Sequence, residues 1–208
     1  MATTDRGSEY AAVVDYGLPS GLHAWHNFDE VPPDYLVSQN DQFCWIDWTT
    51  ASAGDKGLRF TNFGLNIPEG AAINGILVEV WWKTDSNTDP YFTDHHVQLM
   101  KNYVLVGADL GDDVGHLPTE NTKYSYGGFS DKWGTTWTPS EINASGFGIE
   151  ICPKGFGTGV AQVCAIDYVK ITVCYAGAYG HKFVGVDKLD AKKMLGVLST
   201  AVARILGV

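Results

Sequence analysis

The run ILVEVWWK, residues 76–83, has the clearest periodicity in the chain. Its even-numbered residues are all apolar, whereas its odd-numbered residues include Glu79, Trp81 and Lys83. A period of two is typical of a β-strand that buries one face. The run therefore predicts a strand with Trp82 in the core and Trp81 on the opposite face.

Runs of the same kind recur on both sides of this segment. They cover residues 43–48, 58–63, 96–101, 103–106, 133–137, 146–152 and 163–175. Segments rich in Gly, Pro, Asn and Asp separate them, and helical periodicity is confined to one turn at 139–143, capped by Thr138, and to the tail. Eight or nine short strands with such connections predict an all-β, antiparallel two-sheet sandwich, jelly-roll-like in topology.

Three details within these runs carry further predictions. In 163–175 the odd-numbered residues are expected to share the buried face, with Asp167 the one residue out of character. Trp133 and Trp137 are expected to close one open end of the sandwich. Residues 155–159 are glycine-rich but join two strands, so they are interpreted as a hairpin loop, because a phosphate-binding loop must open a helix.

The chain is expected to have three parts. Residues 1–20 contain Gly7, Gly17 and Pro19 among small and polar residues and are predicted to form an N-terminal arm. Residues 21–175 form the sandwich domain, and residues 176–208 form a tail. The tail carries five Lys or Arg against two Asp, which leaves +3 on it and −13 on residues 1–175.

The tail repeats a pattern of two apolar residues, Gly and Val at 183–186, 194–197 and 205–208. Short Gly-closed helices of this kind are marginal alone in water, so they must be buried on the domain or on sister subunits. The tail is therefore predicted to be an assembly element. Its expected contact residues are Phe183, Val186, Met194, Leu195, Val197, Ile205, Leu206 and Val208.

Composition narrows the class of protein. The apolar fraction of 45% is ample for a packed core, and no apolar run reaches the roughly 20 residues of a membrane helix. The net charge of −10 disfavours nucleic-acid binding. The four cysteines form no close pairs and are interpreted as buried free thiols. The first residues lack a secretory signal, so synthesis in the cytoplasm is expected.

Residues 60–83, 126–151 and 165–175 together resemble β-sandwich proteins encoded by tailed bacteriophages, and the Gly-Val repeats resemble tail peptides of phage structural proteins. The resemblance implies a non-enzymatic virion protein, with capsid decoration or cementing through its terminal arms as the preferred role. It also implies a homo-oligomer, with a trimer as one candidate, and contact with other virion proteins such as the major capsid protein. It supplies no catalytic residues and no cofactor.

Metal binding is the main chemical alternative. Asp109, Asp112 and Asp113 lie in the segment ADLGDDVGH and are weak candidates for a calcium site. A second group of acids and histidines at 85–96 matches no metal loop and is interpreted as a solvated loop. No serine or cysteine occupies a nucleophile motif, so no catalytic residue is predicted.

Glycan adhesion is the rival function, alongside attachment to a phage tail or fibre. Seven Trp and ten Tyr exceed the needs of a core of this size, and exposed aromatic rings form platforms on which sugars stack. Trp81 is the residue predicted to leave the core. It is therefore expected to contact either a glycan or a neighbouring subunit.

Overall fold

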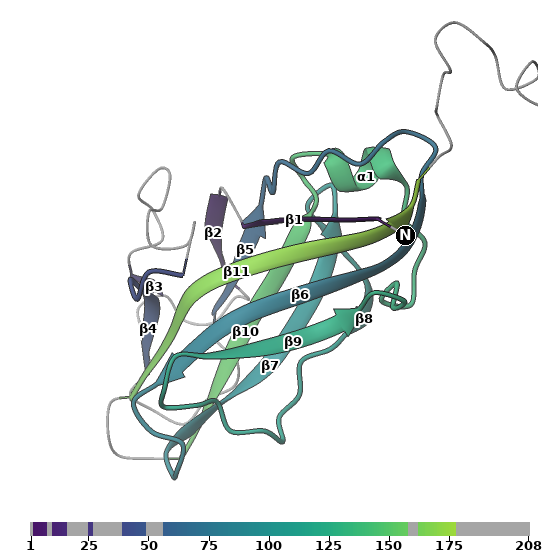
Figure 1. Cartoon of the computed structure of the whole chain (residues 1–208). Coiled ribbons are helices and arrows are strands. Elements are labelled where there is room, and N and C mark those ends of the chain that lie inside the picture. The colour runs from purple at the N-terminus through teal and green to yellow at the C-terminus, as the bar shows by residue number, and fades with distance from the viewer. Residues whose placement is uncertain are drawn as a thin grey trace, which may run out of the picture. The chain divides into compact units, whose positions relative to one another are not determined.

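The computed structural model describes residues 2–7, 10–15, 25–26, 39–48, 56–157 and 162–177. Within these ranges the chain forms two antiparallel sheets, one packed in front of the other in Figure 1, and one short helix. The predicted all-β, jelly-roll-like sandwich is confirmed.

The chain divides into two compact units, Met1–Gly177 and Ala178–Val208. The predicted assembly contacts all belong to the second unit and lie outside the described residues, so the tail stays a prediction. These contacts are Phe183, Val186, Met194, Leu195, Val197, Ile205, Leu206 and Val208.

The first sheet has six strands, in the order β3-β4-β11-β6-β9, with β1 also paired to β11. Its strands are β1 (Ala2–Gly7), β3 (Trp25–His26), β4 (Cys44–Trp48), β6 (Ala72–Thr84), β9 (Thr122–Gly128) and β11 (Gln162–Ala176). Long β11 pairs with β6 along one edge, while β4 and β1 take successive parts of the other edge. The predicted strand at 76–83 is thus an inner strand of this sheet.

The second sheet has five strands, in the order β2-β5-β10-β7-β8. Its strands are β2 (Tyr10–Asp15), β5 (Lys56–Thr61), β7 (Tyr91–Lys101), β8 (Val104–Asp109) and β10 (Gly148–Phe156). The expected hairpin between residues 96–101 and 103–106 is present as β7 and β8, which pair antiparallel.

Several local predictions differ from the structure. Residues 2–7 and 10–15, assigned to an N-terminal arm, form β1 and β2 and add one strand to each sheet. The segment after Gly155 was expected to be a hairpin loop, which is wrong, because β10 and β11 belong to different sheets. No strand forms at 133–137, since Trp133 and Gly134 have positive φ angles of 59° and 67°.

Asp167 is the residue at which the side-chain alternation of β11 changes. Ile166 pairs with Trp82 and Tyr168 pairs with Trp81, so Asp167 is the extra residue of a β-bulge. The parity predicted for 163–175 is therefore correct only beyond the bulge: Cys164 and Ile166 face the core before it, and Val169, Ile171 and Val173 after it. The bulge places Ala165 and Tyr168, three residues apart, on the same outer face.

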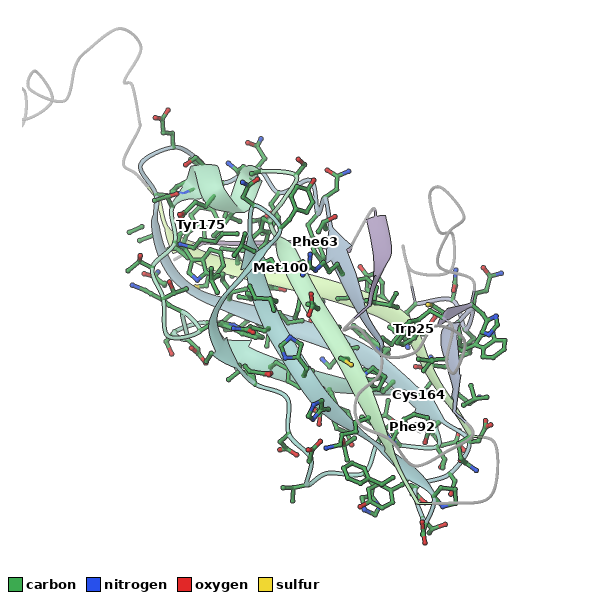
Figure 2. All side chains as sticks on the ribbon, turned by 180° about the vertical axis from the view of Figure 1, so that it is seen from behind. Trp25, Phe63, Phe92, Met100, Cys164 and Tyr175 are labelled. Carbon is green, nitrogen blue, oxygen red and sulfur yellow. The ribbon has the colours of Figure 1, made fainter. Side chains whose placement is uncertain are left out.

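The core lies between the sheets and extends over their length. Figure 2 labels Trp25, Phe92 and Cys164 toward one end and Phe63 and Met100 toward the end that carries the helix. All five side chains are buried. The predicted core position of Trp82 is confirmed, since it is 0% exposed.

Trp133 and Trp137 are both buried and belong to the core cluster, as expected. Trp133 Nε1–H donates to the carbonyl of Ile76 at 2.9 Å, and Trp137 Nε1–H donates to the carbonyl of Lys132 at 3.0 Å. The helix α1 (Pro139–Asn143) follows them and begins at Thr138, which forms a capping box. The predicted single turn is confirmed.

Two further expectations concern the cysteines and membrane-spanning helices. Cys44, Cys152, Cys164 and Cys174 are buried and free, as expected. Across the ranges that the structure describes, no helix is long and apolar enough to cross a membrane.

Candidate functional site

The outward side of the six-stranded sheet carries a set of partly buried aromatic side chains. Trp45 lies opposite Ala165, Ala165 lies opposite Lys83, and Tyr168 lies opposite Trp81. Residues paired across antiparallel strands share a face, so these side chains come together from β4, β11 and β6. We call Phe43, Trp45, Trp81 and Tyr168 the outer aromatic face.

The sheet order determines how the outer aromatic face is laid out. Strands β11, β6 and β9 run side by side in Figure 1, with β4 along the first part of β11. Trp45 and Trp81 are two strands apart across the sheet and two residues apart along it, which places their Cα atoms about 12 Å apart. This span exceeds a single sugar ring.

Trp81 and Tyr168 form the centre of the outer aromatic face. Their ring centroids are 5.3 Å apart and the ring planes are tilted by 43°. The Nζ atom of Lys123, on the neighbouring strand β9, lies 5.8 Å from the Trp81 ring centroid. Both side chains are partly exposed, and a flexible lysine above a ring can move aside.

Glu79 holds two lysines beside this ring pair. Its carboxylate lies 2.5 Å from Lys123 Nζ and 2.7 Å from Lys170 Nζ. Burial by itself raises the pKa of Glu79, but hydrogen bonds and charge interactions with the two ammonium groups outweigh it, and the pKa lies below its ordinary value. Glu79 is therefore ionised at neutral pH and offsets much of the positive charge on this part of the face.

A pocket of about 280 Å³ opens beside the ring pair. It is lined by Phe43, Trp45, Lys83, Thr84, Asp85, Val163 and Ala165. Lys83 Nζ lies 5.3 Å from the Phe43 ring centroid, and His26 stacks on Trp45 with centroids 3.9 Å apart. The pocket thus combines apolar walls with one ammonium and one carboxylate group.

Flat apolar rings with polar groups at their edges suit a ligand that has both characters. A sugar ring presents C–H groups on its faces and hydroxyls around its edge. Tyrosine and tryptophan can pack on the first, while Lys, Asp and Glu can hydrogen-bond to the second. This combination of groups is compatible with a sugar ligand.

Trp81 is the one residue of this face that the sequence predicted, and its outward position is confirmed. Phe43, Trp45 and Tyr168 were missed as its partners. The spacing of Phe43 and Trp45 by two residues was a usable signal. Tyr168 is even-numbered, so the parity predicted for 163–175 already placed it on the outer face. Its pairing with Trp81 depends on the strand register, which the sequence does not reveal.

The candidate calcium ligands do not converge on one point. Asp109 accepts from His96 Nδ1 and from the backbone amides of Val97 and Gly111. Asp112 accepts from the amides of Val114 and Gly115, as a turn-forming aspartate does.

Asp113, the third candidate, is committed to protein donors as well. It accepts from Thr93 Oγ1, His95 Nδ1 and Lys154 Nζ. Burial raises its pKa, but these partners outweigh burial and lower it. Among the side chains that the structure describes, no group of three or more His, Cys, Asp or Glu residues could hold a metal ion.

The outward side of the five-stranded sheet is polar. Glu150 on β10 is 0% exposed and lies 2.5 Å from Arg59 Nε on β5. Its second oxygen lies 3.5 Å from His96 Nε2. Burial of the Glu150 carboxyl raises its pKa to about 7. Glu150 itself cannot meet a ligand directly, and we assign it to the scaffold.

Comparisons with known proteins give little further guidance. No protein-family model and no curated protein matches the chain. Among solved structures, the chain is similar to the second N-terminal cellulose-binding domain of β-1,4-glucanase C from Cellulomonas fimi, with 15% identity and a TM-score of 0.39 over 82% of this chain and 93% of that one.

Two further solved structures show a similar level of likeness. A structure described as CBM4 has 14% identity and a TM-score of 0.38, over 64% of this chain and 85% of that one. The CBM22-1 xylan-binding domain of Xyn10C from Paenibacillus barcinonensis has 12% identity and a TM-score of 0.38, over 84% and 95%. Values this low support no inference from these proteins to the ligand of this chain.

Proposed function

We propose that this domain is a non-catalytic glycan-binding module that holds a polysaccharide chain across its outer aromatic face. The observation that carries the proposal is the convergence of Trp45, Trp81 and Tyr168 from three strands onto one outward surface. An aromatic ring that only fills a core has no reason to lie there. Several such rings in reach of one another suit an extended ligand of more than one sugar ring.

The charges favour a neutral glycan. The chain carries −10 overall, which repels a polyanion at long range. Next to Trp81, the Glu79 carboxylate is shared by Lys123 and Lys170, so the lysines there are already engaged with protein. We therefore expect neutral hexose or pentose polymers to bind in preference to sulfated or uronic-acid chains.

Binding without catalysis agrees with the chemistry of the face. Glycoside hydrolysis needs two carboxyl groups on either side of the scissile bond. Within the described part of the outer aromatic face, Glu79 is held by two lysines, and Asp85 lines the pocket on the same side as Lys83. We assign no acid and base pair to them.

Capsid decoration is the function that the sequence favoured. None of the contacts that the structure describes supports it. Its predicted contacts fall in residues 183–208, outside the described ranges. The glycan-adhesion alternative rests on residues that the structure does describe. Position in a virion, oligomerisation and contact with a major capsid protein remain predictions.

The proposal is tested with the full chain on a glycan array and on insoluble polysaccharides. We expect binding to at least one neutral polysaccharide family and loss of that binding in Trp81→Ala and Tyr168→Ala. Phe129→Ala is the matched control, because Phe129 is an aromatic residue 52% exposed on a loop outside this face. Absence of binding to every glycan, or equal loss in the control, would overturn the proposal.

A further inference from the structure

The pocket beside Trp81 and Tyr168 differs from the open part of the outer aromatic face in shape. Val163 and Ala165 on β11 form a small apolar floor, Phe43 and Trp45 line one side, and Lys83 and Asp85 line the other. Its volume of about 280 Å³ is close to the lower limit for small-molecule sites, roughly 300 Å³. It has room for one sugar ring and not for a chain running through it.

The backbone at the pocket rim is held by hydrogen bonds. Asp85 N–H donates to the carbonyl of Val163 at 3.2 Å, which joins one wall to the floor. Thr84 N–H donates to the carbonyl of Pro118 at 2.8 Å, and its hydroxyl donates to the same carbonyl. The backbone that carries the polar side chains is thus fixed before any ligand arrives, which lowers the entropy that binding costs.

The Lys83 and Asp85 side chains differ from the other charged side chains of the face in their polar contacts. Within the described part of the chain, neither forms an ion pair or a side-chain hydrogen bond, whereas Glu79 is held by two lysines. Lys83 only lies over the Phe43 ring. Among the described residues, this donor and this acceptor on one small apolar pocket have no polar side-chain partner, and they match the hydroxyls at the edge of a sugar.

From this geometry we infer that the pocket binds a single neutral sugar unit, either a one-residue branch or the end of a glycan chain. Lys83 donates to a hydroxyl oxygen of this unit, Asp85 accepts from a hydroxyl, and the floor at Val163 and Ala165 packs against its C–H face. This inference rests on the proposed function. It assigns affinity for the main chain to Trp81 and Tyr168 and selectivity to the pocket.

The test uses the full chain and linear oligosaccharides of two to six units from the polysaccharide that binds best, together with the same oligosaccharides carrying a one-sugar branch. Ala165→Leu fills the pocket with apolar atoms, and Asp85→Asn removes the charged acceptor with little change in volume. Trp81→Ala is the comparison variant outside the pocket. Thermal unfolding checks that each variant is folded.

We expect the wild type to prefer one branched or end-matched oligosaccharide by tenfold or more. Ala165→Leu and Asp85→Asn should each abolish this preference while retaining binding to long chains within about threefold. Trp81→Ala should weaken the binding of every oligosaccharide and of the long chains. If Trp81→Ala loses binding but both pocket variants keep the wild-type preference, the pocket inference is wrong and the proposed function stands; if the wild type binds no oligosaccharide, both are wrong.

Discussion

Trp81 on β6 lies directly opposite Tyr168 on β11, with ring centroids 5.3 Å apart. This pair shares the outer face with Ala165 and its neighbour Trp45 because Asp167 is an extra residue in β11. Without the bulge, alternation would place Ala165 and Tyr168, three residues apart, on opposite faces. Asp167 is itself 0% exposed, and it accepts from Asn40 N–H at 3.3 Å and from Asn121 Nδ2–H at 2.8 Å. A buried, hydrogen-bonded carboxylate thus fixes the geometry of the outer aromatic face.

Asp167→Ala should therefore affect stability and glycan binding together. Loss of this buried acceptor removes its hydrogen bonds to Asn40 N–H and to the Asn121 amide, which costs about 2 kcal/mol in the free energy of unfolding. Asp41→Ala is the matched control, since Asp41 accepts from the same Asn121 amide at 2.9 Å but is exposed. Urea denaturation measures the difference, and an equal, small effect of both variants would show that Asp167 does not hold the bulge.

Tyr126→Phe should be strongly destabilising. Trp82 Nε1–H donates to the Tyr126 hydroxyl at 3.1 Å, and this hydroxyl donates to Asp94 at 2.7 Å, all three residues being buried. Without the hydroxyl, an indole N–H and a carboxylate lose their partners, at a cost of about 2 to 3 kcal/mol. Tyr124→Phe on the same strand, where the hydroxyl is exposed, should change the free energy of unfolding by less than about 0.5 kcal/mol. Equal effects in the two variants would contradict this account.

Two neighbouring glycines should respond differently to alanine. Gly127 has φ +69°, and an added Cβ would lie 2.4 Å from Trp133 Nε1 and 2.5 Å from the Ile76 carbonyl. An added Cβ at Gly128 meets nothing within 4 Å. We expect Gly127→Ala to lower the free energy of unfolding by at least about 2 kcal/mol. Gly128→Ala should lower it by less than about 0.5 kcal/mol. Chemical denaturation measures the free energy of unfolding of both variants. A Gly127→Ala variant as stable as the wild type would contradict this prediction.

Glu150 should make the domain less stable as the pH rises from about 4.5 to 7. Burial raises its pKa to about 7, so in this window the folded chain keeps a proton that the unfolded chain has released. The stabilisation is complete below the unfolded pKa and is lost as the pH rises through the folded pKa. Its upper limit is about 3 kcal/mol.

Glu150→Gln removes this titration, so its unfolding free energy should fall less than that of the wild type between pH 5 and pH 8. Glu141→Gln is the control: burial raises the pKa of Glu141, but its bonds to Thr138 and Lys101 outweigh burial and lower it, so Glu141 titrates below the window. Its profile should run parallel to the wild type. Urea denaturation at several pH values gives the free energy of unfolding of the wild type and both variants. If all three proteins show the same pH dependence, Glu150 does not have this role.

Much of the fold could be predicted because alternation is a local signal. Residues 76–83 formed the expected strand, with Trp82 buried and Trp81 outside. Strand β1 was missed because its sequence is polar and is stabilised by pairing with β11, which no local pattern reveals. Strand β2 carries Val13 and Val14, but Gly7, Gly17 and Pro19 around it indicated an arm. Strand β9 (Thr122–Gly128) was missed because its glycines and polar residues are typical of a loop.

The predicted strand at 133–137 failed for a physical reason. Asp131 Oδ1 accepts from Trp133 N–H at 2.7 Å, and this turn competes with an extended backbone. For the site, the sequence identified Trp81 but not its neighbours. Which residues meet across strands depends on register, and the register of β11 changes at one buried aspartate.

Isothermal titration calorimetry of the full chain with its preferred soluble polysaccharide tests the central claim most directly. The outer aromatic face predicts saturable binding by the wild type and by Phe129→Ala. For Trp81→Ala it predicts a loss of about 2 kcal/mol, which corresponds to about thirtyfold in affinity. Unchanged affinity in Trp81→Ala, or no heat of binding with any neutral polysaccharide, would contradict the account.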